Sequence, residues 1–320
     1  MTHARHPLLV ATGFVALDRI FSPDGKPAFS ALGGSSGNVL ANAAALGART
    51  LGLYRIGADV PGRQVRVEME GLGCDVSMVR ADPGIVTPVI EHLVAREDGG
   101  APGHHEFRRV DPLTGTSLGR WSSIEASDVE RLIRYAVPPQ VMYFDRVSAP
   151  ILHAATWARE QGTLIIFEPS AIRDPDLFRQ AMELAHIVKI SAERMAEIVA
   201  GALPPASTMI ITLGARGLQF RLSPDDDWIS LPAVDARSVI DTAGAGDMVT
   251  AALIWQILDH GWQVDGSVLS GTLRLGQELA ALNCEYIGAR GLIHALGADP
   301  FRALAQRLRS AGTTHLASST

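Results

Sequence analysis

Residues 241–253, DTAGAGDMVTAAL, join a run of small residues to an apolar run with helical character. Glycines at 244 and 246 let the main chain turn tightly and approach a ligand closely, because they carry no Cβ. The first N–H groups of the following helix lack partners within the helix, and together with the helix dipole they favour an anion. Asp247 stands beside that position, where a base can take a proton from an attacking hydroxyl. Positioning, electrostatics and a base are what phosphoryl transfer requires, but this stretch alone favours the plainer interpretation of a glycine-rich helix start with an ordinary first-turn Asp.

Around this stretch, short apolar segments alternate with segments of helical periodicity. The expected strands are PLLVATG (7–13), TLGLYRIG (50–57), VMYFD (141–145), TLIIFEP (163–169), IVKIS (187–191) and TMIITLG (208–214). The expected helices are GNVLANAAALGA (37–48), GRQVRVEMEGLG (62–73), APILHAATWAREQG (149–162), PDLFRQAMELA (175–185) and ERMAEIVAG (193–201). This alternation predicts an α/β fold with a doubly wound, mostly parallel sheet flanked by helices.

Two early regions break the alternation, DRIFSPDGKPAFS (18–30) and IVTPVIEHLVAREDGGAPGHHEFRRV (85–110). Each contains strand-like pieces around a Gly/Pro-rich turn and no helical pattern. We predict one domain over 1–320, with a small β-sheet lid formed by about 18–32 and 85–111 inserted in it. Such a lid would cover a substrate and exclude water. A pair of surface hairpins without a gating role is the alternative.

The composition excludes several classes of protein. The chain has 320 residues, of which 47% are hydrophobic and 19% charged, as in a globular protein. Its net charge of −6 predicts neither nucleic acid nor anionic lipid as a partner. No apolar run approaches the ~20 residues of a membrane span. Cys74 and Cys284 are far apart and form no C-x-x-C pair, which indicates buried free thiols and a cytoplasmic location.

Four segments in a fixed order resemble the signatures of the ribokinase-like carbohydrate kinases, also called the phosphofructokinase-B family. They are GGSSGNVLANAAALG (33–47), IGADVPGRQV (56–65), ITLGARGL (211–218) and DTAGAGD (241–247). The resemblance extends from about residue 8 to residue 295. It implies a doubly wound α/β domain with a β lid, and transfer of the ATP γ-phosphate to a hydroxymethyl group of a sugar, with Mg²⁺.

Two alternatives stay open: a nucleoside kinase of the same fold, and a non-catalytic sugar-binding or regulatory protein on this scaffold. A nucleotide-dependent oxidoreductase is disfavoured, because no G-x-G-x-x-G motif follows the first strand.

The resemblance also implies how the phosphate and the acceptor are bound. Asp247 resembles the catalytic base, and Gly244, Ala245 and Gly246 resemble the anion hole. The residues that resemble sugar contacts are Asp18, Gly33, Gly34 and Asn38. A turn former and a helix cap are the competing interpretations of Asp18 and Asn38. Asp145 follows a strand at the sheet edge where α/β proteins bind ligands, so it is a further acceptor contact or, equally, a solvated loop acid.

The remaining implied residues concern the nucleotide and cations. Thr212, Gly214 and Gly217 resemble the nucleotide loop, and Asn283 resembles a residue of the base pocket. Asp241 and Ala243 resemble carbonyl ligands of a monovalent cation, K⁺, with GARG (288–291) as the partner loop. The family's N-x-x-E motif, which orients water bound to magnesium, is here KISAER (189–194). Ser191 and Arg194 occupy its Asn and Glu positions, so Glu193 is the candidate for that role.

The remaining expectations concern Lys189, the segment 167–171, the binding partners and the assembly. Lys189 is a candidate phosphate contact, against the plainer interpretation of a solvated lysine at a strand end. FEPSA (167–171) stands where the family more commonly has Asp-Pro-Asn. The expected partners are ATP and a small-molecule sugar, and the resemblance implies a homodimer formed through the lid edges.

Overall fold

The computed structural model describes residues 9–22, 25–94, 105–110, 115–134, 138–192, 208–262 and 265–317. An eight-stranded sheet organises it, in the order β14-β13-β12-β11-β10-β9-β1-β4. The strands are β1 (Leu9–Thr12), β4 (Thr50–Gly52), β9 (Val141–Phe144), β10 (Leu164–Phe167), β11 (Ile187–Ser191), β12 (Thr208–Thr212), β13 (Leu218–Arg221) and β14 (Ile229–Leu231). The strands from β4 to β12 are parallel, and β13 and β14 pair antiparallel. Every residue of β1, β9 and β10 is buried, as expected of strands covered on both faces.

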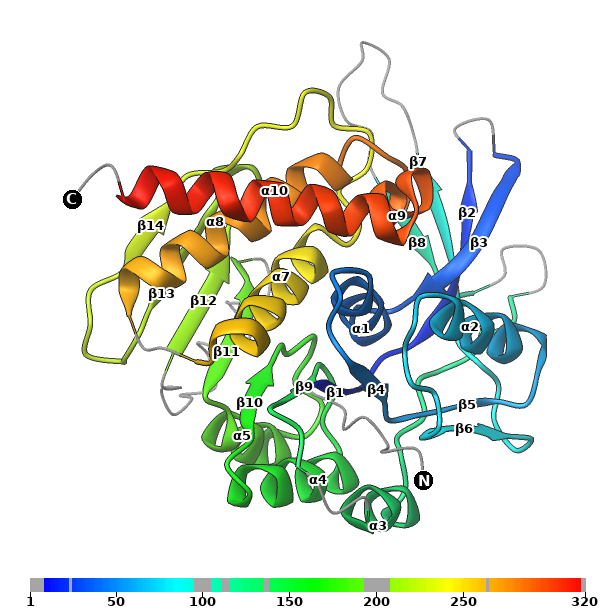
Figure 1. Ribbon diagram of the computed structural model, residues 1–320. Helices are drawn as coiled ribbons and strands as arrows, with labels where there is room; N and C mark the ends of the chain where they lie inside the picture. The colour runs from blue at the N-terminus through cyan, green and yellow to red at the C-terminus, as the bar shows by residue number, and fades with distance from the viewer. Residues whose placement is uncertain are drawn as a thin grey trace, which may run out of the picture.

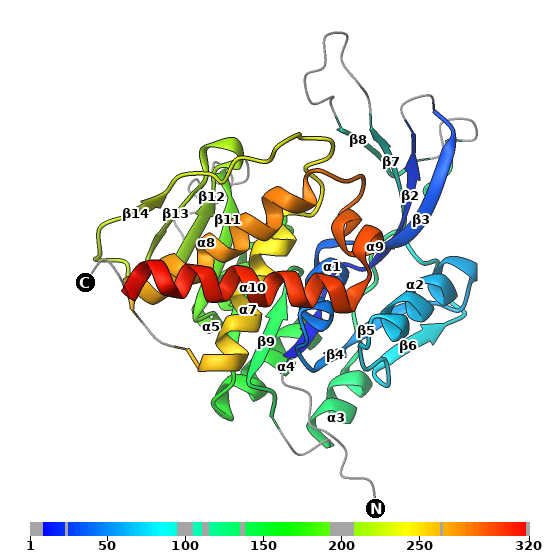
Figure 2. The same ribbon diagram turned by 45° about the horizontal axis from the view of Figure 1, so that its top comes forward.

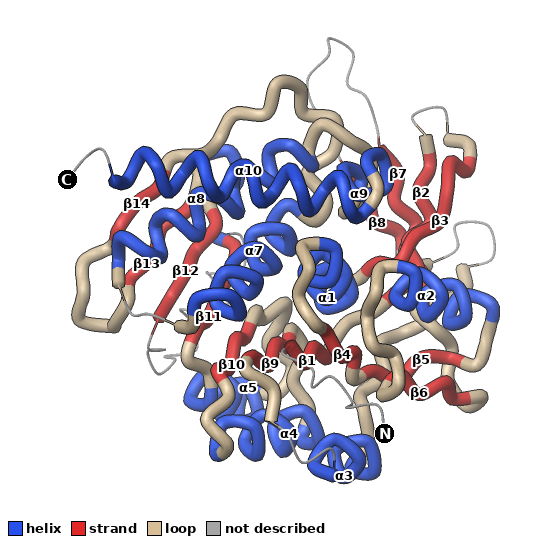
Figure 3. Tube along the Cα trace, viewed as in Figure 1, coloured by secondary structure: helices blue, strands red, loops and turns tan. Residues whose placement is uncertain are grey.

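Helices cover both faces of this sheet, which confirms the doubly wound α/β prediction (Figures 1 and 3). On one face lie α1 (Ser35–Ala45), α7 (Ala245–His260), α8 (Gly266–Asn283), α9 (Gly291–Leu296) and α10 (Ala298–Ala317). On the other lie α3 (Ala126–Arg134), α4 (Ala149–Glu160) and α5 (Pro175–Leu184). β1 alternates between two apolar cores, because Leu9 and Ala11 pack in one and Val10 in the other.

A second, four-stranded sheet with the order β3-β2-β7-β8 stands away from the central sheet (Figure 2). Its strands are β2 (Ala16–Phe21), β3 (Pro27–Gly33), β7 (Val89–Val94) and β8 (His105–Arg108). Two antiparallel pairs, β2–β3 and β7–β8, join through a parallel β2–β7 pairing. The two early regions without helices thus lie side by side in one sheet, which we call the lid sheet.

The strand predicted over 50–57 is wrong in one respect, because it is two strands in different sheets. β4 pairs with β1, whereas β5 (Tyr54–Gly57) pairs with β6 (Val79–Asp82). The Tyr54 ring folds back over Gly52, where a Cβ would lie 2.9 Å from the ring. The apolar pattern runs through this break, so it gave no sign of it. The helix predicted over 193–201 lies outside the described residues.

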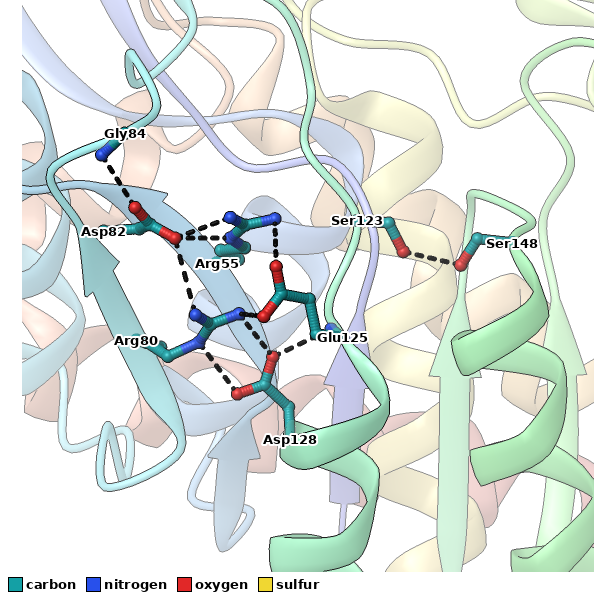
Figure 4. A network of polar contacts seen from close by, with 8 residues as sticks. All are labelled: Arg55, Arg80, Asp82, Gly84, Ser123, Glu125, Asp128 and Ser148. Carbon is teal, nitrogen blue, oxygen red and sulfur yellow. Dashed lines mark hydrogen bonds and ion pairs between the residues drawn. The ribbon is translucent and has the colours of Figure 1, made fainter.

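An ion-pair network ties the β5–β6 pair to α3 (Figure 4). Arg80 binds both carboxylate oxygens of Asp128 at 3.0 Å, and Arg55 binds Asp82 at 2.6 Å. Glu125 accepts from both arginines. Nearby, α4 is preceded by Ser148, whose hydroxyl lies 2.6 Å from that of Ser123. The bidentate geometry at the buried Asp128 fixes α3 against this small sheet. α2 (Val60–Gly71) packs against the strands β2 and β3 of the lid sheet.

Two other sequence expectations can be compared with the described residues. Cys74 and Cys284 are both buried and unpaired, as predicted. None of the helices in the described ranges combines the length and apolarity needed to traverse a bilayer.

Candidate active site

The start of α7 forms the centre of the candidate site. Gly244 precedes the helix with a φ of +73°, a left-handed conformation that favours glycine. A Cβ there would lie 2.5 Å from the Ala289 carbonyl oxygen. The first helical bond runs from Met248 N–H to Gly244 O, so the N–H groups of Gly246 and Asp247 have no helical partner. Residues 244–247 are each half-buried, so this helix start is not enclosed in the core.

Asp247 lies in the first turn of α7 and faces α1. Its Oδ2 accepts a hydrogen bond of 2.8 Å from Asn38 Nδ2. Burial raises the pKa of Asp247 to about 7, and the negative charges of Glu168 and Asp145 add to this. The Asn38 hydrogen bond and the Lys189 charge act in the opposite direction. A carboxylate with a pKa near neutrality is suited to general-base chemistry.

A buried ion pair lies beside the same helix start. Lys189 is 1% exposed, and its Nζ lies 2.5 Å from Glu168 Oε1. A Cβ on Gly246 would lie 3.5 Å from that ammonium, so the positive charge borders the first turn of α7. Thr250 holds the other Glu168 oxygen with a hydrogen bond of 2.7 Å. The solvated-lysine interpretation is therefore wrong. Glu168 belongs to FEPSA (167–171), a segment for which the sequence predicted no role.

Asp18 of β2 and Gly33 of β3 are diagonal neighbours, since Asp18 pairs with Ala31 and Gly33 with Ala16. A Cβ on Gly33 would lie 2.1 Å from the Asp18 carboxylate, so only glycine allows this approach. Burial raises the pKa of Asp18 to about 7, against the lowering effect of the Arg290 charge. A small pocket beside Asp18 is lined by the lid sheet and by the loop before α9. Gly34 directly precedes α1, and Asn38 lies inside that helix rather than capping it.

Asp145 is buried at the end of β9, so the solvated-acid interpretation is wrong. Its Oδ1 accepts the Phe14 N–H at 2.8 Å, and its Oδ2 accepts from Arg146 at 2.8 Å. A Cβ on Gly13 would lie 1.9 Å from Oδ1. The carboxylate is thereby fixed at the carboxyl end of the sheet, close enough to influence Asp247 electrostatically.

Sequence reasoning missed two residues that surround Asn38. Arg290 donates from Nη1 to Asn38 Oδ1 and from Nη2 to the Leu32 carbonyl oxygen. The same Nη2 lies 2.6 Å from Glu68 Oε1. Arg290 belongs to GARG (288–291), predicted as a cation loop, and Glu68 to the helix predicted over 62–73, and neither side chain was predicted to contact the site. No sequence pattern places α2 beside the loop before α9, which follows it by more than two hundred residues.

The predicted nucleotide residues lie on the neighbouring strands. Thr212 ends β12 and pairs with Ser191 of β11. Gly214–Arg216 form a 3₁₀ turn, and Gly217 leads into β13. This turn therefore lies next to the strand that carries Lys189. Glu193 and Arg194 lie outside the described residues.

The predicted cation segment is tied to the loop before α9. Asp241 is fully buried; its Oδ1 accepts the Ala243 N–H and its Oδ2 the Gly288 N–H, each at 2.7 Å. Asn283 is also fully buried, donates to Ala289 O and accepts from Leu292 N–H. These contacts show Asn283 supporting the loop, and its place in a base pocket stays a prediction.

Comparison with known proteins identifies the class. A solved aminoimidazole riboside kinase from Salmonella enterica superposes with a TM-score of 0.70 at 20% identity, covering 94% of this chain and 99% of that one. The fold is thus that of the ribokinase-like kinases. The family described as pfkB family carbohydrate kinase matches residues 30–296, and the chain belongs to it.

Curated relatives are similar over most of the chain. The fructokinase of Klebsiella pneumoniae is 25% identical, over 80% of this chain and 87% of its own length. The bifunctional protein HldE of Rhodopseudomonas palustris is 28% identical over 69% of this chain. The match spans 46% of HldE, so this chain corresponds to about half of that relative.

Proposed function

We propose that this member of the family is an ATP-dependent kinase that phosphorylates a hydroxymethyl group of a sugar or sugar derivative. One observation carries the proposal. The carboxylate of Asp247 lies in the first turn of α7, next to unpaired N–H groups and the Lys189 ammonium, and is bonded to Asn38 of α1. A base, an anion-binding helix start and a residue on the acceptor side therefore meet at one place.

The reaction follows from these positions. Asp247 takes the proton of the acceptor hydroxyl, and the oxygen of that hydroxyl forms a bond to the γ-phosphorus of ATP. The bond from that phosphorus to the bridging oxygen breaks, and ADP leaves. The N–H groups of residues 244–246 and the Lys189 ammonium stabilise the negative charge on the moving phosphoryl group. The Ala245 N–H makes a long bond of 3.3 Å to Thr242 O, which an incoming phosphate would replace.

The acceptor lies, in this proposal, between the lid sheet and the end of β9. Asp18 accepts hydrogen bonds from sugar hydroxyls, and Gly33 and Gly34 allow the sugar to approach the main chain. Asn38 and Asp145 complete the contacts. The lid sheet closes over the sugar and keeps out water that would otherwise hydrolyse ATP.

The nucleotide lies, in this proposal, along the ends of β11 and β12. Thr212, Gly214 and Gly217 hold the phosphates and ribose, and Asn283 lies toward the base. Mg²⁺ usually keeps several waters and is bound through substrate phosphates and one or two carboxylates. Glu193 is the carboxylate proposed to act through such a water, and the metal would neutralise phosphate charge.

A monovalent cation fits the segment that contains Asp241 and Ala243. K⁺ is bound in proteins by rings of backbone carbonyl oxygens. The same segment contains the fully buried Asp241 carboxylate, whose negative charge favours a cation nearby. The cation would lie next to the residues that precede α7 and would stabilise their backbone conformation.

The lid sheet also suggests an assembly. Its edge strands are β3 and β8, and they carry exposed apolar side chains at Phe29 and Phe107. We propose that these edges pair in a homodimer, and that the enzyme works in the cytoplasm, where its buried thiols stay reduced.

ADP release tests the proposal. Purified protein is assayed with MgATP, KCl and a panel of hexoses, pentoses, sugar acids and nucleosides. We expect turnover with one class of sugar, and Asp247→Asn should lower kcat by roughly 10²–10⁴-fold. Asp259→Asn, the same change near the other end of α7, should have no effect. Turnover only with nucleosides would identify a nucleoside kinase, and sugar binding without turnover a binding protein.

A further inference from the structure

A continuous chain of hydrogen bonds leads from α2 to the proposed base. Glu68 binds Arg290 at 2.6 Å, Arg290 binds Asn38 Oδ1, and Asn38 Nδ2 binds Asp247 Oδ2 at 2.8 Å. His294 lies 3.2 Å from the same Glu68 oxygen. Four separate parts of the chain thus meet in one polar path. Of these residues, only Asn38 and Asp247 have a role in the proposed reaction.

The side-chain amide of Asn38, in the middle of this path, has only one favourable orientation. A guanidinium has donors and no acceptor, an ionised carboxylate has acceptors and no donor, and an amide has one end of each kind. If the Asn38 amide rotated by half a turn, its oxygen would face the Asp247 carboxylate and its NH₂ group would face Arg290. Both contacts would then be repulsive. Arg290 therefore determines which end of Asn38 faces the base.

Arg290 is itself held in place on several sides. It is 2% exposed and also donates to the Leu32 carbonyl oxygen. Glu68 accepts both from Arg290 and, at 2.5 Å, from the Leu32 N–H. Burial alone would raise the pKa of Glu68, but the His294 hydrogen bond, the Arg290 charge and the Leu32 N–H lower it to about 2. The ionised carboxylate balances a guanidinium that would otherwise be buried without a counterion.

We propose that Arg290, anchored by Glu68, is a positioning residue for phosphoryl transfer. It orients the Asn38 amide so that its NH₂ group holds Oδ2 of Asp247, and Oδ1 remains to receive the acceptor proton. The role in transfer rests on the proposed function, whereas the orientation of the carboxylate can be measured without turnover.

Replacing Arg290 should therefore change the titration of Asp247. Without the guanidinium the amide can turn, and the carboxylate loses a hydrogen bond that lowers its pKa. The other charged groups near Asp247 are Glu168, Lys189 and Asp145, and the substitution leaves them in place. The pKa of Asp247 should rise above its value of about 7.

The test is a titration of the aspartate side chains by ¹³C NMR, with protein labelled at aspartate Cγ. The Asp247 signal is assigned by its absence in Asp247→Asn. In Arg290→Met we expect its midpoint to move up by about one pH unit, since one hydrogen bond to a charged group is lost. Arg290→Lys, which can still donate to Asn38, should recover most of the wild-type midpoint. Arg302→Met, a similar change on α10 away from this path, should leave it unchanged.

Kinetics provide the second measurement. For the acceptor found in the panel, Arg290→Met should lower kcat at pH 7 by about fivefold, because a one-unit rise from a pKa of about 7 leaves about a tenth of Asp247 ionised, and should leave the KM for ATP unchanged. Much of this loss should be recovered at pH 9, where Asp247 is ionised again. If Arg290→Met does not fold, Glu68→Gln is measured in its place, and we expect a smaller rise in the Asp247 midpoint.

The outcomes separate the two proposals. A folded Arg290→Met or Glu68→Gln variant with a wild-type Asp247 midpoint would overturn the positioning role, whatever the activity. A shifted midpoint in a wild-type protein that phosphorylates nothing in the panel would support the hydrogen-bond path and reject the proposed function.

Discussion

Lowering the pH should switch this enzyme off close to neutrality. The proposed base must be ionised to take the acceptor proton, and the pKa of Asp247 is raised by burial to about 7. We expect kcat/KM to be constant at high pH, to start falling near pH 7, and to fall at least tenfold for each further pH unit, since protonation of Asp18 weakens acceptor binding over the same range. The profile reports the free enzyme, so it can be compared directly with the geometry described above.

The size of the effect distinguishes this site from an ordinary carboxylate. With a pKa of about 7, only about a tenth of Asp247 is ionised at pH 6, and kcat/KM should fall to that fraction or lower. With the unperturbed value of 3.8, more than ~99% would be ionised at pH 6 and no loss would be seen. Glu168→Gln removes the negative charge that contributes most to the shift, so the midpoint should move to lower pH.

The assay is initial-rate ADP release between pH 5 and 9 at constant ionic strength, with circular dichroism to show that the protein stays folded. Asp18 is the control, because its pKa is also raised to about 7. Asp18→Asn should weaken acceptor binding and leave the Asp247 midpoint in place. A wild-type profile that stays flat down to pH 5, or a midpoint that disappears in Asp18→Asn, would refute the assignment.

Three further substitutions test the surrounding structure. Gly244→Ala should destabilise the fold by about 1–3 kcal/mol in urea unfolding, because of its positive φ and the 2.5 Å approach to Ala289 O, and should lower turnover as well. Gly33→Ala should raise the acceptor KM at least ~10-fold with the ATP KM unchanged, because the new Cβ would displace the Asp18 carboxylate. Asp128→Asn should cost about 1–3 kcal/mol in thermal unfolding without changing turnover, because it breaks a bidentate pair remote from the proposed site.

Each of these has a clear contrary result. Gly71 ends α2 with nothing near its Cβ position, so Gly71→Ala is the control for Gly244→Ala. Equal stability of the two alanine variants would show that the bend before α7 is not constrained. An unchanged acceptor KM in Gly33→Ala would place the sugar elsewhere. Loss of turnover at full stability in Asp128→Asn would connect the ion-pair network to catalysis.

The sequence predicted the fold well because its strands are buried on both faces. Continuous apolar runs such as VMYFD and TLIIFEP can only be central parallel strands when helical segments lie between them. The division between β4 and β5 was not predictable, since Leu53 continues the apolar run and β5 gains a different partner, β6, from a later part of the chain. The local sequence pattern predicts whether a segment is a helix or a strand, whereas tertiary packing determines where that helix or strand ends.

The candidate site could be predicted where its residues are close together in the sequence. The helix start at 244–247 depends on local backbone geometry, which the glycine spacing indicates. Asp59 in the segment 56–65 is different: it caps α2 and binds Thr87, so this motif has a structural role as well. Glu68, Glu168 and Arg290 were not assigned, because each gains its partner from a distant part of the chain. A buried charge is informative only once its counterion is known.

A crystal structure with ADP, magnesium, aluminium fluoride and the best acceptor would test the central claim most directly. Aluminium fluoride imitates the phosphoryl group in transit. We predict that it binds at the start of α7 within hydrogen-bond distance of the Gly246 N–H, with Asp247 Oδ1 against the acceptor hydroxyl and Asn38 on Oδ2. Aluminium fluoride bound away from this helix start, or an Asp247 carboxylate turned away from the acceptor, would contradict the account.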